Sequence, residues 1–400
     1  MKIVTIVGAR PQFIKAAAVN RAIQGLNERE KRIQEILVHT GQHYDDLMDR
    51  VFFEELKLPR PDYHLGVGSG SHAQQTGMIL ERVEPVLQKE KPEGVMVYGD
   101  TNSTLAGALA AAKLNIPVAH VEAGLRSYNR TMPEEINRAV TDQLSTWLFC
   151  PTDQAVRNLS KEGIKDGRTR IVKNVGDVMY DSILYYSKIA EEKSSIIKDL
   201  DLCLSTPNSC TERLQTVPFQ TPNYYLATLH RAENTDNPKK LKSILKALDE
   251  IGKNAPVILP LHPRTKKMMD VFHFPSKFKN IKFIEPVSYL DMLQLEKKAK
   301  AILTDSGGVQ KEAYWFRVPC FTLREETEWV ETTISGWNVL TGTNRKKIVG
   351  EVGRLEKRRK YPKARKIYGD GKASQKIVQI LIRHFRKSAE SAKSRKARNV

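Results

Sequence analysis

Cysteine is scarce in this sequence, and no long apolar run is present. The cysteines among the 400 residues show no CxxC spacing, which argues against a disulfide framework and against a zinc site: Cys150, Cys203, Cys210 and Cys320. We therefore expect buried thiols and no bound metal. No segment reaches the roughly 18 consecutive apolar residues that cross a membrane, and the first residues lack the layout of a cleavable signal. These absences predict a cytoplasmic protein without a transmembrane segment.

Sequence motifs for common cofactors are missing as well. The turn after residues 2–7 reads Gly8-Ala9-Arg10-Pro11 instead of GxGxxG, and the glycines of residues 66–70 do not lie between a strand and a helix. A tightly bound nicotinamide is therefore not expected. The sequence also contains neither a Walker A loop nor an HExxH motif. We expect no cofactor.

Positive charge is abundant but unevenly distributed. The formal net charge is +19, and residues 351–400 hold 17 Lys or Arg against 4 Asp or Glu. The basic clusters at residues 383–387 and 393–396 lack the repeated interleaving of aromatic residues that would stack on bases. We therefore expect a solvated helix face with a frayed end and no nucleic-acid partner. An anionic membrane surface is an alternative contact.

Short β-branched runs alternate with segments of helical length along the whole chain. The predicted strands are residues 2–7, 34–39, 94–98, 117–122, 147–150 and 170–175, then 224–229, 256–261, 281–284, 301–304, 319–323 and 337–340. This alternation predicts parallel sheets in an α/β fold. Because 400 residues exceed the size of one hydrophobic core, we expect two Rossmann-like domains with an active-site cleft between them. Further predictions are helices at residues 177–198 and 373–385 and a surface loop at residues 199–223.

Residues 305–312, Asp-Ser-Gly-Gly-Val-Gln-Lys-Glu, follow a predicted strand and open a helical pattern. A Ser-Gly-Gly turn at a helix start presents backbone N–H groups at the positive end of the helix dipole, which suits a diphosphate. Glu312 lies one turn further on and could accept hydrogen bonds from a ribose diol. The segment therefore predicts a nucleotide-diphosphate site, and the alternative is an ordinary glycine-rich turn between a strand and a helix.

Acidic residues follow the strands of the first half at the sheet edge where ligands bind in open α/β folds. Asp100 and Glu122 each come just after a predicted strand, and Glu134 lies in Pro-Glu-Glu-Ile-Asn-Arg, which is also an ordinary helix start. Several acids near a sugar can remove and return a proton, with their surroundings deciding which is the base. The charge of a departing diphosphate would be offset by Arg10, Lys15 and His230.

As a set, six motifs resemble the non-hydrolysing UDP-N-acetylglucosamine 2-epimerase family. In family order they are residues 8–12 (GARPQ), 40–43 (TGQH), 99–103 (GDTNS), 120–126 (HVEAGLR), 133–138 (PEEINR) and 305–312 (DSGGVQKE). The resemblance implies a glycosyltransferase-B architecture: a first domain of residues 1–178 completed by a crossover helix at about 372–386, and a UDP-binding domain of residues 179–371. Residues 387–400 would form a basic tail. A homodimer is also implied.

The resemblance implies a reaction as well: anti elimination of UDP across C1 and C2, through a 2-acetamidoglucal intermediate, with re-addition of UDP after protonation on the other face. Acid and base roles would fall on Asp100, Glu122 and Glu134, in an order that the sequence leaves open, and Lys15 and His230 would assist departure of UDP. The remaining implied substrate contacts are Arg10, Arg138, Ser306, Gly307 and Gly308 at phosphate, Glu312 at ribose, and Pro286 with Tyr289 at uracil.

Two segments differ from typical bacterial members of this family. The link at residues 127–132 is short and resembles the branch that acts on UDP-2,3-diacetamido-2,3-dideoxy-glucuronate. Residues 70–76 lack the arginine that binds a second, activating UDP-GlcNAc, although Gln42, His43 and His262 resemble other parts of that site. Allosteric activation is therefore not expected. The alternative functions are a retaining glycosyltransferase of the same architecture and a hydrolysing epimerase.

Overall fold

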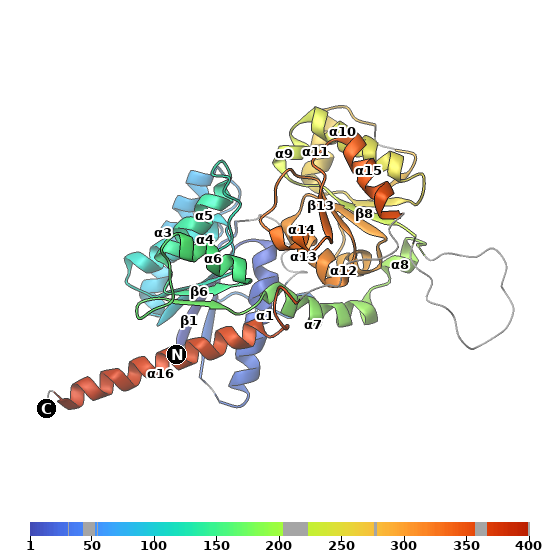
Figure 1. Cartoon of the computed structure of the whole chain (residues 1–400). Coiled ribbons are helices and arrows are strands. Elements are labelled where there is room, and N and C mark those ends of the chain that lie inside the picture. The colour runs from blue at the N-terminus through green and yellow to red at the C-terminus, as the bar shows by residue number, and fades with distance from the viewer. Residues whose placement is uncertain are drawn as a thin grey trace, which may run out of the picture. The chain divides into compact units, whose positions relative to one another are not determined.

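The computed structural model describes residues 1–30, 32–42, 53, 55–202, 223–275, 278–356 and 366–398 (Figure 1). The chain divides into two compact units: unit 1 comprises Met1–Leu184 and Lys366–Val400, and unit 2 comprises Tyr185–Arg365. These divisions lie a few residues from the predicted boundaries at 178 and 371. His43 and residues 203–222, most of the predicted surface loop, lie outside the described residues.

The sheet of unit 1 is parallel throughout its described strands and has the order β3-β2-β1-β4-β5-β6-β7. Its strands are β1 (Lys2–Val7), β2 (Gln34–His39), β3 (Tyr63–His64), β4 (Gly94–Tyr98), β5 (Val118–Val121), β6 (Trp147–Cys150) and β7 (Ile171–Asn174). All except β3 were predicted. Strand β3 was missed because two residues are too short to show the alternation that marks a strand.

Helices connect these strands, as a parallel sheet requires. They are α1 (Arg10–Asn27), α3 (His72–Glu90), α4 (Asn102–Lys113), α5 (Pro133–Leu144), α6 (Asp153–Lys161) and α7 (Val178–Lys193), the last of which continues into unit 2. Several begin at a side-chain cap: Thr101 accepts a hydrogen bond from Thr104 N, and Thr152 accepts one from Ala155 N. These caps fix where the chain leaves the carboxyl ends of β4 and β6.

Unit 2 also contains a parallel sheet, with the order β10-β9-β8-β11-β12-β13 among the described residues. The strands are β8 (Tyr225–Thr228), β9 (Val257–Pro260), β10 (Ile281–Ile284), β11 (Ala301–Thr304), β12 (Cys320–Thr322) and β13 (Asn338–Leu340). Alternate residues at β8 belong to two different hydrophobic cores. Tyr225 and Ala227 pack into one core, and Tyr224 and Leu226 pack into the other. Both faces are therefore covered, as in other parallel sheets.

The helices of unit 2 precede, separate or follow these strands in sequence. They are α8 (Ile196–Asp199), α9 (Ala232–Thr235), α10 (Pro238–Ile251), α11 (Pro263–Val271), α12 (Tyr289–Lys298), α13 (Gly307–Phe316), α14 (Val330–Ile334) and α15 (Arg345–Glu356). Figure 1 shows α10 and α15 side by side, and they are in contact. The predicted α/β class, with two Rossmann-like domains, is confirmed.

The last helix, α16 (Ala373–Arg398), packs along α1 of unit 1 (Figure 1). The expected helix ended near residue 385 and was followed by a frayed end, but the helix continues to Arg398. The reason is composition: residues 386–398 contain alanine, lysine, arginine, serine and glutamate without glycine or proline, so nothing ends the helix. Across the described residues, no helix is both long and apolar enough to cross a membrane.

Candidate functional site

Unit 1 brings together five residues predicted for the site: Lys15, Asp100, Glu122, Glu134 and Arg138. Lys15 Nζ forms an ion pair with Glu122 Oε2, and Arg138 Nη2 lies 3.1 Å from Asp100 Oδ2. Asp100 and Glu122 follow the carboxyl ends of β4 and β5, two strands that pair directly, and Glu134 lies in the first turn of α5. The sheet therefore places carboxylates and cations in one cluster, as expected for this edge.

Asp100 is held from α5 by two neighbouring residues. Asn137 Nδ2 donates a hydrogen bond of 2.9 Å to the backbone oxygen of Asp100, and Arg138 pairs with its carboxylate. Partial removal from water raises the pKa of Asp100, whose side chain is 37% exposed. The nearby charges of Arg138 and Lys15 lower this pKa, Glu122 and Glu134 raise it, and the net direction is upward. Asp100 therefore holds a proton to higher pH than an ordinary aspartate, as an acid–base group requires.

Glu122 occupies a backbone conformation that is uncommon for a non-glycine residue, with φ of +74°. The amides of Glu122 and Ala123 both donate to Phe149 O, and this pairing holds the turn after β5. The Glu122 side chain is nearly buried and points to Lys15. Strained backbone of this kind is found at functional sites, where the surrounding structure compensates for it.

The other predicted residues of unit 1 lie at helix starts. Arg10 is the first residue of α1 and is half-buried, and Glu134 is half-buried in the first turn of α5. Glu135, its neighbour, accepts hydrogen bonds from the amides of Ser127 and Tyr128 at 2.9 and 3.0 Å and also pairs with Arg138 Nη1 at 3.0 Å. Glu135 thus orders the link at residues 127–132 and shares Arg138 with Asp100, although we expected it to point away from Arg138.

In unit 2, Asp305 organises the start of the predicted diphosphate site. Its side chain is fully buried and accepts hydrogen bonds from the backbone amides of His230 (3.1 Å) and Arg231 (3.1 Å). Its Oδ1 also lies 3.4 Å from His230 Nδ1. Partial removal from water lowers the pKa of His230, Asp305 opposes this, and Arg231 and Arg324 add to it. His230 is therefore held beside the turn that begins α13.

Ser306 caps helix α13, with its hydroxyl facing Val309 N at 3.5 Å. Gly307 is packed closely, because an added Cβ would lie 2.4 Å from Glu328 Oε1. At Gly308 an added Cβ would meet only Ser306 Oγ, at 3.8 Å, which is an ordinary contact. The fold therefore does not require glycine at 308, whereas a ligand seated on the first amides of α13 would.

Glu312 lies further along α13 with 6% of its surface exposed, next to Glu296 from α12, which is fully buried. Burial raises the pKa of Glu296 well above its usual value, and the charge of Glu312 and a hydrogen bond between the two side chains raise it further. The net direction of the Glu296 pKa is therefore upward, which favours its protonated form beside Glu312. Sequence reasoning missed Glu296, although a glutamate in the leucine-rich, buried stripe of α12 was a readable signal.

The three remaining predicted residues of unit 2 are placed differently. His262 caps α11, accepts a hydrogen bond from Arg264 N at 3.2 Å, and has its ring 5.5 Å from that of His230. Tyr289 begins α12 and is buried, with its ring 5.7 Å from that of Tyr186. Pro286 is exposed between β10 and α12.

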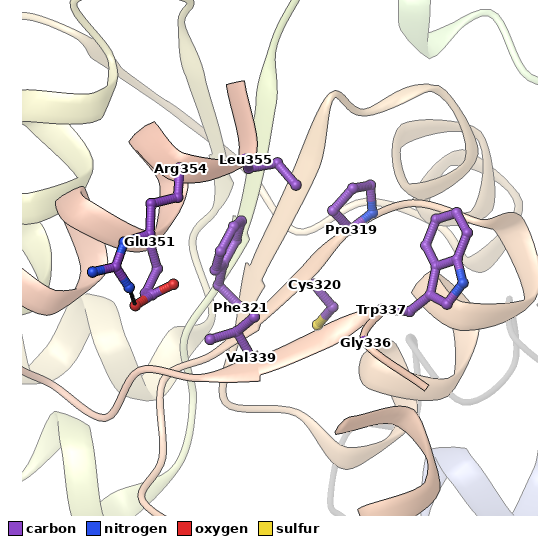
Figure 2. A pocket seen from close by; sticks show the side chains of 9 residues that line it. All are labelled: Pro319, Cys320, Phe321, Gly336, Trp337, Val339, Glu351, Arg354 and Leu355. Carbon is purple, nitrogen blue, oxygen red and sulfur yellow. Dashed lines mark hydrogen bonds and ion pairs between the residues drawn. The ribbon is translucent and has the colours of Figure 1, made fainter. Parts of the chain in front are cut away.

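A separate cavity in unit 2 lies elsewhere on the sheet. Figure 2 shows its lining, which contains none of the predicted site residues: Pro319, Cys320, Phe321, Gly336, Trp337, Val339, Glu351, Arg354 and Leu355. Pro319 and Gly336 precede β12 and β13, so the cavity lies toward the amino ends of these strands. Ligands of open α/β sheets bind at the opposite edge, and we therefore do not assign the site here. In the described part of the chain, no cluster of three metal-ligating side chains is found.

The candidate residues of unit 1 and those of unit 2 indicate a class of protein. Unit 1 offers carboxylates beside cations, which can move a proton, and unit 2 offers a capped helix start with a buried acid one turn on, which can hold a nucleoside diphosphate. A nucleotide-sugar enzyme of the α/β class fits both.

Comparison with known proteins gives the family. The family model described as UDP-N-acetylglucosamine 2-epimerase matches residues 26–382, and the chain belongs to this family. A UDP-N-acetylglucosamine 2-epimerase homolog of Methanococcus maripaludis is 51% identical over 384 residues, 95% of this chain and 99% of the relative. The UDP-2,3-diacetamido-2,3-dideoxy-D-glucuronate 2-epimerase of Pseudomonas aeruginosa is 48% identical, with coverage of 96% and 100%.

Solved structures agree with this assignment. The UDP-GlcNAc 2-epimerase of Methanocaldococcus jannaschii, in complex with UDP-GlcNAc and UDP, matches with a TM-score of 0.84 at 45% identity, covering 96% of this chain and 99% of that one. The predicted family is confirmed, and the epimerase is favoured over the glycosyltransferase alternative.

Proposed function

We propose that this enzyme interconverts a UDP-2-acetamido sugar and its C2 epimer. The acids of unit 1 would act on the sugar, and Ser306, Gly307 and Gly308 of unit 2 would bind the diphosphate. The observation that carries the proposal is the pairing in unit 1: Asp100 with Arg138, and Glu122 with Lys15.

The reaction proceeds by elimination and re-addition. One carboxylate of the set Asp100, Glu122 and Glu134 takes the proton from C2, the C1–O bond breaks, and the bonding electrons leave with UDP. A 2-acetamidoglucal intermediate remains. Protonation of C2 from the other face and attack of UDP oxygen on C1 complete the epimerisation. Lys15 and His230 stabilise the departing diphosphate, and Arg10 and Arg138 provide further positive charge.

Recognition of UDP is assigned to unit 2. Glu312 accepts hydrogen bonds from the ribose hydroxyls, and Glu296 fixes its carboxylate from behind. Pro286 is exposed and can contact uracil, whereas the buried ring of Tyr289 supports the uracil site through its packing on Tyr186. His262, whose ring lies beside that of His230, is placed to contact the diphosphate.

Two sugars are candidates for the physiological substrate: UDP-GlcNAc and UDP-2,3-diacetamido-2,3-dideoxy-glucuronate. The short link at residues 127–132 and the relative from Pseudomonas aeruginosa favour the second. An assay of both sugars side by side, with products identified by NMR, decides between them. Release of a free 2-acetamido sugar would instead identify a hydrolysing epimerase, and transfer to an acceptor would identify a glycosyltransferase.

We also propose that the enzyme is a cytoplasmic homodimer. The family resemblance supports the dimer, and the buried free thiols of Cys150 and Cys320 suit a reducing compartment. Sedimentation of the full chain at several concentrations tests the dimer, and fractionation of cells tests the location.

A further inference from the structure

A fully buried histidine lies between the turns that carry two of the candidate acids. His120 on β5 has 0% of its surface exposed. Its Nδ1 lies 2.7 Å from Asp142 Oδ1, and its Nε2 lies 2.8 Å from the backbone oxygen of Gly99. A carbonyl oxygen only accepts hydrogen bonds, and so does an ionised carboxylate. If Asp142 is ionised, both ring nitrogens must therefore carry hydrogen.

The surroundings of Asp142 show that it is ionised. Its Oδ2 accepts hydrogen bonds from Arg126 Nη1 at 2.7 Å and from Gly124 N at 3.2 Å. The positive charge of Arg126 and the amide of Gly124, both on this one oxygen, favour the ionised form of the carboxylate whatever the charge of His120.

The network extends outward through Arg126. Its Nε and Nη2 donate to both oxygens of Glu162 on α6, at 2.7 and 2.6 Å. Two cations, His120 and Arg126, thus balance two carboxylates, Asp142 and Glu162. Cys150 on β6 is also near the carboxylate of Asp142, and burial raises the pKa of this thiol well above its usual value, so that it stays neutral.

The network touches the backbone of both acid-bearing turns. Gly99, which receives the hydrogen bond from His120, directly precedes Asp100 and has φ of +65°. Gly124, which donates to Asp142, lies two residues after Glu122 and has φ of +82°. An added Cβ at Gly124 would lie 2.4 Å from Ala155 O, so this turn cannot shift toward α6. One ion network therefore sets both turns.

We propose that His120 is a permanently protonated positioning residue, whose imidazolium holds the Asp100 turn through Gly99 and the Glu122 turn through Asp142. The ring acts on the reaction only by holding these turns. It positions the acids and does not itself exchange a proton with the sugar. The inference about alignment rests on the proposed function, whereas the charge of the ring does not.

The protonation state is measured directly by NMR of the full chain labelled with ¹⁵N in histidine. A free histidine titrates near pH 6.5 and is neutral at about pH 8.5. We expect one ring, that of His120, to keep hydrogen on both nitrogens at this pH. The signal is assigned by its loss in His120→Gln, or by its change to a neutral ring in Asp142→Asn if the first variant does not fold. Nine rings that are all neutral at about pH 8.5 would overturn the proposal.

Kinetics of Asp142→Asn test the alignment. The amide keeps the shape of the side chain but removes the negative charge that faces the His120 ring. We expect kcat at about pH 8 to fall by about tenfold to a hundredfold, with a partial recovery near pH 5.5 and UDP affinity within about twofold of the parent, because misplacement of reacting groups costs this much. A merely structural role would lower activity equally at every pH, and that result, like an undiminished kcat, would contradict the proposal.

Glu162→Gln is the matched control. It alters the same network at its outer end, where Glu162 is one-third exposed, and leaves both contacts of the His120 ring in place. We expect nearly normal kcat and an unchanged pH profile, and a loss as large as that of Asp142→Asn would assign the effect to the network's stability instead. If the parent protein shows no epimerisation, the proposed function fails, while the NMR result still decides the charge of His120.

Discussion

Lys15 on α1 and Glu122 after β5 form an ion pair although only 9% and 8% of their side-chain surfaces are exposed. Removing one partner from a buried pair leaves an uncompensated charge, which costs about 3–5 kcal/mol. We therefore expect Lys15→Met to lose roughly this much unfolding free energy together with most of its turnover. The double variant Lys15→Met, Glu122→Gln should regain stability but not activity, as denaturant unfolding and initial rates would show. Stability that stays low in the double variant would mean that the pair does not act as a unit.

The three acids should be needed for turnover but not for UDP binding. We expect Asp100→Asn, Glu122→Gln and Glu134→Gln each to lower kcat by about two orders of magnitude or more, the range of general acid or base groups. UDP affinity, measured by calorimetry, should change little because UDP is assigned to unit 2. Normal turnover in any of the three would remove that residue from the mechanism.

The variant Gly308→Ala tests whether glycine at this position is needed for ligand binding or for folding. The new Cβ meets nothing in the protein closer than 3.8 Å, and alanine favours a helix over glycine by about 0.5–1 kcal/mol, so the melting temperature should be unchanged or higher. The methyl group would lie over the amides that receive the diphosphate, and we expect UDP affinity to fall about tenfold or more.

The control for this variant is Gly353→Ala on α15, where an added Cβ meets nothing within 4 Å. It should raise stability without any change in UDP affinity. Equal UDP affinities in both alanine variants would place the diphosphate away from Gly308.

The raised pKa of Glu296 predicts that the stability of the protein depends on pH. Folding raises the pKa of this carboxyl above 4.5. Its destabilising effect on the fold is therefore absent below that pH, where the carboxyl is protonated in both states, and grows as the pH rises toward the pKa of the folded protein. Glu296→Gln carries no titrating proton, and its amide can still donate to Glu312. The melting temperature of the variant, relative to the parent, should therefore rise between about pH 5 and pH 8.

Glu285→Gln serves as the control for Glu296, because the Glu285 side chain is 89% exposed. Its melting temperature should follow the parent at every pH. A Glu296→Gln curve that also runs parallel to the parent would show that Glu296 is not held neutral by the fold.

Local sequence signals predicted the strands and the helix starts of the site. Asp100, Glu122 and Ser306 each lie one or two residues after a strand, and a parallel sheet gathers such positions at one edge, so their grouping within each unit followed from order alone. Glu296 and Glu312 are contributed by different helices, and the two residues of β3 are too few to show the alternation of a strand. The full length of α16 follows from a composition without glycine or proline. The link from His120 to Asp142 joins β5 to α5 across 22 residues, and no spacing rule predicts it.

Elimination and re-addition require that a proton leave and return at C2 while UDP is detached. Incubation of the enzyme in D₂O with UDP-GlcNAc, and separately with UDP-2,3-diacetamido-2,3-dideoxy-glucuronate, followed by NMR, measures this exchange. We expect deuterium at C2 of product and of recovered substrate with at least one of these sugars. Turnover of either sugar with hydrogen retained at C2 would contradict this mechanism.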